Sequence, residues 1–237
     1  METTTENLSN ALLDVRRAHR ILYAYQRRML DLVHFIQSKL GMPVKDLCGI
    51  KHFSKPIYGR SIGHTPLNIW PTMWAWDYLY SYLFEYYLGE KETGDKPHNY
   101  KLSLIQYSDT GYFDQDGQKR GRISEFGSEE ESSSKLLFFL EYKPKGSKWE
   151  WGDGTSLKKI VLDKEFGSKK HEKDVRYTSA DGKQILYSFP LERFINMEAT
   201  LEVLREFRSY CQEQDIHVFD NLTLERTCTP TSSSSEE

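Results

Sequence analysis

The clearest pattern in the chain is a row of apolar residues near its N-terminus. The row alternates spacings of three and four and runs through Leu8, Ala11, Val15, Ala18, Leu22, Tyr25, Met29, Leu32 and Ile36. Such spacing sustains a heptad seam and predicts a long helix over residues 7–40, which Gly41 and Pro43 end. The second half of this helix is apolar nearly all round, as in a buried helix. We therefore expect that half inside the domain, and a first half that packs on one side only and projects or oligomerises.

A second helix is predicted in an aromatic-rich stretch that follows the irregular residues 43–71. Pro71 suits the first position of a helix and Gly89 its C-cap. The intervening residues 72–88 hold many Trp and Tyr rings, which we expect to supply a large share of the core.

Further along, the pattern changes to β. Strands are predicted at Tyr100–Tyr107 and Lys135–Tyr142, with a short one near 122–126. The strand at Lys135–Tyr142 is apolar on both faces, as in a central strand. Residues 175–189 favour a hairpin that turns at Asp181-Gly182. A last helix is predicted over residues 192–214, followed by short strands at 216–219 and 222–224. Its buried side is expected to carry Met197, Leu201, Leu204, Phe207 and Cys211.

This order of helices, then strands, then helix and short strands predicts an α+β fold. It combines the heptad-patterned N-terminal helix, the aromatic-rich second helix, a mostly antiparallel central sheet and a C-terminal helix followed by short strands. The 237 residues suit a single domain over residues 7–226, with residues 1–6 and 227–237 expected to be disordered.

Composition and charge narrow the function classes. Hydrophobic residues make up 38% and the net charge is −3, which argues against a globally basic nucleic-acid binder. Three cysteines (Cys48, Cys211 and Cys228) form a low, odd count that fits a reducing compartment. Because the chain also lacks a long apolar stretch and a signal-type N-terminus, we expect a cytoplasmic protein without a membrane partner.

Strong catalytic motifs are missing from the sequence. It contains no G-x-x-x-x-G-K-[ST], G-x-G-x-x-G, H-E-x-x-H or G-x-S-x-G, which lowers the odds of the enzyme classes that these motifs mark. Cys48, His52 and His64 have zinc-like spacing but no evident fourth ligand, so we predict no structural metal site.

One catalytic hypothesis remains, at Glu141-Tyr142-Lys143, which closes the most apolar strand. Residues i and i+2 of a strand share a face, so the acid can bind Mg²⁺ or Mn²⁺ while the lysine stabilises charge. The pattern resembles the metal-dependent nucleases of the PD-(D/E)xK type, although no Pro-Asp dipeptide exists here. That resemblance implies an aspartate before the pair, for which Asp109, Asp114 or Asp116 qualifies, and a glutamate on the preceding helix, for which Glu85 qualifies.

The N-terminal helix also carries a local excess of positive charge. Residues 8–40 hold six Lys or Arg against two acids, and the candidate binding residues among them are Arg16, Arg17, Arg20, Arg27 and Arg28. These side chains suit phosphates or an acidic protein surface. Trp149 and Trp151 alternate within a Gly-rich loop and are candidates for an interface.

Together these patterns favour a non-catalytic protein that binds another macromolecule. We expect a protein partner or self-association through helix 7–40, with no cofactor. The first alternative is a Mg²⁺- or Mn²⁺-dependent nuclease that uses Glu141 and Lys143. The second is a nucleic-acid binder that contacts phosphates through the arginines of the first helix.

Overall fold

The computed structural model describes residues 5–42, 83–92, 98–113, 127–144, 174–179 and 182–225. Its helices and strands are α1 (Thr5–Lys39), β1 (Leu83–Glu92), β2 (His98–Tyr107), the short 3₁₀ helix η2 (Thr110–Phe113), β3 (Lys135–Pro144), β4 (Asp174–Ser179), β5 (Gly182–Pro190), η5 (Leu191–Phe194) and α4 (Met197–Glu213). The strands form one antiparallel sheet in the order β1-β2-β3-β5-β4. The predicted α+β class is confirmed.

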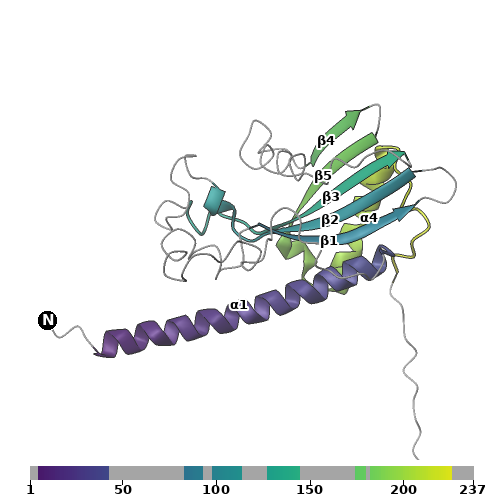
Figure 1. Ribbon diagram of the computed structural model, residues 1–237. Helices are drawn as coiled ribbons and strands as arrows, with labels where there is room; N and C mark the ends of the chain where they lie inside the picture. Colours follow the sequence, from purple (N-terminus) through teal and green to yellow (C-terminus); the bar gives the residue numbers. More distant parts are fainter. Residues whose placement is uncertain are drawn as a thin grey trace, which may run out of the picture.

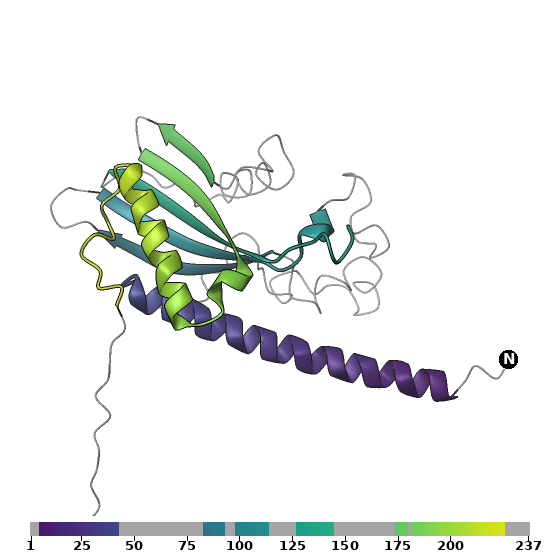
Figure 2. The ribbon, with the colours of Figure 1, turned by 180° about the vertical axis from the view of Figure 1, so that it is seen from behind.

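One face of the sheet is covered by helices. In Figure 1 α4 lies behind the sheet, and in Figure 2, seen from the other side, it lies in front; the C-terminal half of α1 runs along the β1 edge. Alternate sheet residues such as Leu104, Phe138 and Phe189 form a single apolar cluster with residues of both helices, including Ile36 and Phe207. No described helix lies on the opposite face of the sheet.

The predicted N-terminal helix is confirmed, with its start at Thr5 rather than residue 7. Its last residue is Lys39, and Gly41, the predicted stop, follows with a φ of 60°. The amides of Gly41 and Met42 donate to the carbonyls of Ser38 and Gln37, the pair of bonds that defines a Schellman motif. A residue with a side chain is strained at this φ, which explains why glycine ends the helix.

The predicted aromatic-rich second helix is wrong over residues 83–88, which form β1 instead. Tyr86 and Leu88 join the helix-covered core, whereas Glu85 and Tyr87 belong to the opposite face. Aromatic residues fit a pleated sheet well, and this alternation is a strand's rather than a helix's. Gly89, expected as a helix cap, follows a bulge in β1 and has a φ of 112°. The earlier part of the predicted helix lies outside the described residues.

The central strands confirm the sequence pattern. All residues from Leu136 to Leu140 in β3 are buried, as expected for a strand apolar on both faces. The predicted hairpin is β4–β5. Gly182, expected in its turn, is instead the first residue of β5 and pairs with Ser179 of β4.

The C-terminal region differs from prediction in two ways. Met197 is 55% exposed rather than buried, because the helix begins only there, after the capping residue Asn196. Residues 216–219 and 222–224 are turns and irregular chain, not strands. Arg205 and Arg208 of α4 donate to the carbonyls of Leu224 and Leu222. These side chains satisfy carbonyl groups that a neighbouring strand would satisfy in a sheet. The short strand near 122–126 and the tail from 227 lie outside the described residues.

Candidate functional site

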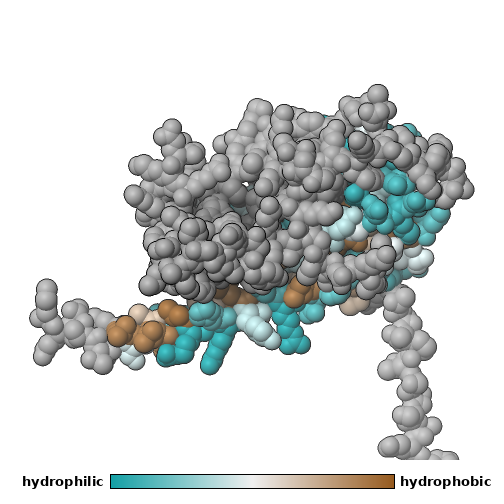
Figure 3. Space-filling model, viewed as in Figure 1, coloured by the Kyte–Doolittle hydropathy of each residue, from teal (hydrophilic) through white to brown (hydrophobic). Residues whose placement is uncertain are grey.

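The N-terminal half of α1 extends beyond the sheet. Every residue from Leu8 to Ala24 is exposed, over about 25 Å of helix at 1.5 Å per residue. The exposed seam includes Leu8 (60% exposed), Val15 (50%) and Leu22 (41%). Figure 3 shows hydrophobic residues at the surface of this projecting part, next to hydrophilic ones. The same seam continues into the body, where Met29 and Ile36 are buried.

The boundary between the projecting and docked halves is a hydrogen-bonded junction at Tyr25. The Gln106 side-chain amide donates to the Tyr25 hydroxyl (3.0 Å) and to the Ser108 hydroxyl (3.1 Å). Tyr86 donates to the carbonyl oxygen of the same Gln106 amide (2.7 Å). One turn further along α1, Arg28 donates to the backbone carbonyl of Ile195 (2.6 Å). These bonds fix the point from which the helix projects.

A groove lies against this junction. Its volume is about 500 Å³, and α1, the segment Ser132–Ser134 and η5 line it. Its apolar lining includes Met29, Leu32 and Phe194, so the groove continues the exposed seam of α1 toward the body.

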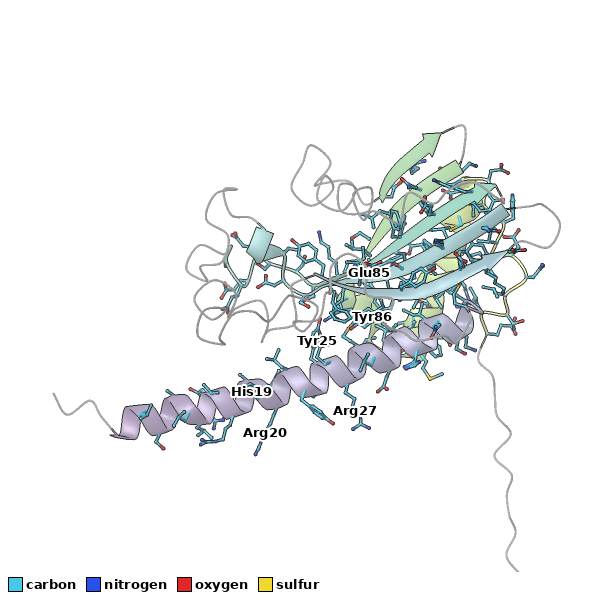
Figure 4. All side chains as sticks on the ribbon, viewed as in Figure 1. His19, Arg20, Tyr25, Arg27, Glu85 and Tyr86 are labelled. Atoms are coloured by element: carbon cyan, nitrogen blue, oxygen red, sulfur yellow. The ribbon has the colours of Figure 1, made fainter. Side chains whose placement is uncertain are left out.

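The candidate arginines lie on a different side of α1. In the heptad that places the seam at positions a and d, Arg16, Arg17, Arg20 and Arg27 occupy positions b, c and f. Figure 4 shows Arg20 and Arg27 pointing away from the sheet, while Tyr25 points toward it. All four are exposed, and Arg17 forms an ion pair with Asp14 on the same helix (3.0 Å). Among the described residues, Arg28 is the arginine of this set for which a bond to the body is found, to the Ile195 carbonyl.

A second group of functional candidates lies on the sheet face that the helices leave uncovered. The Lys143 ammonium is 3.2 Å from Glu141 Oε1, and Gln184 Nε2 donates to the same oxygen (3.0 Å). Glu141 is 0% and Lys143 5% exposed, so the predicted pair is buried. On the same face Ser103 donates to Glu85 (2.8 Å).

Asp109, one of the described residues of the nuclease hypothesis, is not brought to this pair. Glu141 pairs with Lys101, and Tyr107 lies six residues further along β2. At about 3.4 Å per residue this distance is roughly 20 Å, and Asp109 follows Tyr107 by two more residues. Because β2 and β3 are antiparallel, their C-terminal ends lie at opposite ends of the strands. Asp109, which follows β2, accepts a hydrogen bond from the Gly111 amide instead (2.9 Å).

Glu85 of the same hypothesis lies on strand β1, not on a helix, and pairs with Ile105 of β2. Asp114, Asp116, Trp149 and Trp151 lie outside the described residues. Within the described part of the chain, no cluster of three or more His, Cys, Asp or Glu side chains is arranged to hold a metal ion.

Two buried oxygen atoms near the Glu141–Lys143 pair have no hydrogen-bond partner, Glu141 Oε2 and Asn99 Oδ1. Asn99 pairs with Lys143 in the sheet and Lys101 pairs with Glu141, so Asn99 and Glu141 are diagonal neighbours on one face. An unsatisfied buried acceptor costs about 1–3 kcal/mol. Sequence reasoning missed Asn99, because a lone asparagine at the start of a strand carries no spacing signal.

Burial raises the pKa of several described groups, of which Tyr87 and Cys211 are candidates for chemistry. Burial, together with Glu90 and Glu85, raises the pKa of Tyr87 to about 12, so its hydroxyl stays protonated on the same face as Glu85. Burial, with a smaller contribution from Asp220, raises the pKa of the Cys211 thiol. A thiol with a raised pKa is a poor nucleophile, so Cys211 is a core residue.

The described residues thus define an α+β protein in which two helices cover one face of an antiparallel sheet and one of them projects as an arm. A family model described as PM0109 matches residues 5–220, and the chain belongs to this family. No curated protein and no solved structure matches the chain. Among the described helices, none has the length and apolar character needed to cross a membrane.

Proposed function

We propose that this protein assembles with a second copy of itself through the projecting half of α1. The observation that carries the proposal is the seam, which is buried by the body from Met29 onward and exposed from Leu8 to Leu22. A row of exposed apolar residues in continuous register with a buried row is typical of a helix–helix interface.

The sizes of the seam residues favour an antiparallel pair. In antiparallel coiled coils, position a of one helix packs against position d of the other. With the two-fold axis between Val15 and Ala18, Val15 faces Ala18 and Leu22 faces Ala11 of the second copy. Each small residue then meets a larger one, as close packing requires. A parallel pair would place alanine against alanine in two layers and leave them underfilled.

The position of the body favours the same orientation. The sheet and η5 occupy the seam side of α1 from Tyr25 onward. In a parallel pair, both bodies would compete for the same space beyond this residue. An antiparallel pair puts the bodies at opposite ends and brings the N-terminal end of each α1 to the other copy's groove beside Met29 and Phe194. The arginines at positions b, c and f stay on the outside.

The test is the mass of the full chain in solution. Wild type is expected to have twice the chain mass of 27.9 kDa at micromolar concentration. The double variant Val15→Lys/Leu22→Lys places charges in the seam and is expected to be monomeric. Leu13→Lys/Tyr23→Lys adds the same charges at exposed positions off the seam and is the matched control, which should remain dimeric. A monomeric wild type would refute the proposal.

A second candidate function is metal-dependent cleavage of nucleic acid. The observation that favours it is the juxtaposition of an acid and a lysine on one strand, with the Lys143 ammonium 3.2 Å from Glu141 Oε1. Cleavage of DNA or RNA with Mg²⁺ or Mn²⁺ should disappear in Lys143→Met, provided that circular dichroism finds the variant folded. Cleavage that persists unchanged in the folded variant would exclude these residues.

Nucleic-acid binding without cleavage is the remaining alternative, and it depends on the exposed arginines. It predicts steep salt dependence, which Arg16→Ala together with Arg20→Ala would reduce. Equal salt dependence in wild type and variant would exclude it.

A further inference from the structure

The groove beside α1 lies on the path of the exposed apolar seam. The residues of α1 that line it occupy heptad positions d, g, a and d, in the order Tyr25, Arg28, Met29 and Leu32. The seam of the projecting half occupies the same positions a and d. A second helix that packs along this seam therefore reaches the groove where the projecting half ends.

Hydrogen bonds join the three walls of the groove. Arg28 of α1 donates to the carbonyl of Ile195, which follows η5 (2.6 Å). The amide of Leu191, the first residue of η5, donates to the carbonyl of Ser134 (2.9 Å). Because the walls are already joined within one chain, they lose little conformational entropy when the groove is filled, which favours binding.

We propose that this groove binds the first turn of α1, Thr5–Leu8, from a second copy of the chain. The inference rests on the antiparallel self-association proposed above and uses the same register. That register places Leu8 of the second copy against Tyr25, and Thr5 of the second copy against Arg28. The first turn thus enters the groove at Tyr25, and the N-terminus of the helix points into the rest of the groove.

The polar lining of the groove complements a helix N-terminus. The first four amides of an α-helix have no acceptor within the helix, and the helix dipole gives this end a partial positive charge. Glu192 contributes a carboxylate to the lining, and Ser132 and Ser133 contribute hydroxyl groups. Ser132 Oγ donates to the carbonyl of Ser128 (2.7 Å), so it meets an incoming amide as an acceptor.

The apolar lining complements the side chain of Leu8. Ile195 lines the groove and is 67% exposed, whereas the neighbouring Phe194 is buried. Leu8 is 60% exposed on the projecting half of α1. Contact between Leu8 of one copy and Ile195 of the other removes apolar surface of both from water, which stabilises the complex.

The experiment measures the dimer dissociation constant of the full chain by sedimentation equilibrium. Ile195→Lys places a charge inside the groove, so the dissociation constant should rise about tenfold or more. Met197→Lys is the matched control, because Met197 is also exposed but is not among the described residues that line the groove. Its dissociation constant should stay within about twofold of wild type.

A double-mutant cycle identifies the segment that fills the groove. Leu8→Ala and Ile195→Ala should each weaken the dimer. Together they should weaken it by less than the sum of the two free-energy changes, because both remove the same contact. Leu8→Ala and Met197→Ala should be additive.

The outcomes separate this groove contact from the self-association on which it rests. In a dimeric wild type, equal dissociation constants for Ile195→Lys and Met197→Lys would overturn the groove contact and leave the seam proposal standing. Strict additivity of Leu8→Ala with Ile195→Ala would overturn it as well. A monomeric wild type would refute self-association and this inference together. If circular dichroism finds Ile195→Lys unfolded, Ile195→Ala compared with Met197→Ala gives the same test.

Discussion

Replacing Lys143 with methionine is expected to destabilise the fold strongly. Methionine has nearly the same length but no charge, so it leaves the Glu141 carboxylate buried with only Gln184 beside Oε1. Removing one partner of a buried ion pair costs about 3–5 kcal/mol. For a chain of this size, each kcal/mol lowers the melting temperature by about 2–4 °C, so a fall of roughly 6–20 °C is expected.

The double variant Glu141→Leu/Lys143→Met should recover most of this loss. Replacing both buried charges by apolar side chains is often neutral or stabilising, although Gln184 loses its acceptor here. The exposed pair of Arg17 with Asp14 provides the matched control, and Arg17→Met should stay within about 1 kcal/mol of wild type. The assay is urea unfolding with a chelator present, followed by circular dichroism.

A single outcome would refute this reasoning about the buried pair. If Lys143→Met costs less than about 1 kcal/mol, as expected of exposed pairs, the Glu141–Lys143 pair is not enclosed as its exposed fractions of 0% and 5% indicate. A double variant no more stable than the single one would show that the loss comes from packing and not from an unpaired carboxylate.

Three further predictions concern the fold. Phe138→Ala should cost about 3–5 kcal/mol in chemical unfolding, because this ring packs against three others in the core, and a loss below about 1 kcal/mol would contradict that packing. Asn196→Ala removes the cap that accepts from the Ala199 amide (2.9 Å) and should cost about 1 kcal/mol; no change would mean that the cap is dispensable. Burial raises the pKa of Tyr100 to about 12, above its ordinary value of 10.0. Below pH 10 this hydroxyl has no effect on the pH dependence of folding stability. Between pH 10 and 12 it ionises in the unfolded chain but not in the folded one, so the folding stability falls over that interval. This decrease in the free energy of unfolding is on the order of 2–3 kcal/mol. It should be absent from the alkaline unfolding curves of Tyr100→Phe and still present in those of the exposed control Tyr23→Phe.

The local periodicity of the chain predicts α1, the central strand and the hairpin well. Each of these elements has one dominant pattern: a heptad row, an apolar run or two strands around a glycine turn. Residues 83–88 do not predict their strand because apolar side chains at five of the six positions hide the distinction between helical and strand periods. The misassigned strands at 216–219 and 222–224 have a tertiary cause. Buried residues such as Ile216, Phe219 and Leu224 pack in the core without a ladder, and arginines of α4 bond the carbonyls of Leu222 and Leu224.

The candidate sites likewise divide into features that one segment of the sequence predicts and features that depend on pairing between segments. The pairing of Glu141 with Lys143 follows from the i, i+2 rule of a single strand, and the exposed first half of α1 follows from its one-sided pattern. The separation of Asp109 from Glu141 depends on strand direction, and the approach of Asn99 to Glu141 depends on register between two strands. Neither can be read from one segment of the sequence alone.

The most direct test of self-association is disulfide formation across the α1 seam. An antiparallel pair with its axis between Val15 and Ala18 places residue 22 opposite residue 11 of the second copy. Mixing Ala11→Cys with Leu22→Cys chains should therefore give cross-linked dimers above the wild-type background, while Leu22→Cys alone should not, because its two copies lie about 16 Å apart along the helix axis. Cross-linking by Leu22→Cys alone would indicate a parallel pair, and no cross-linking in the mixture would contradict antiparallel self-association through α1.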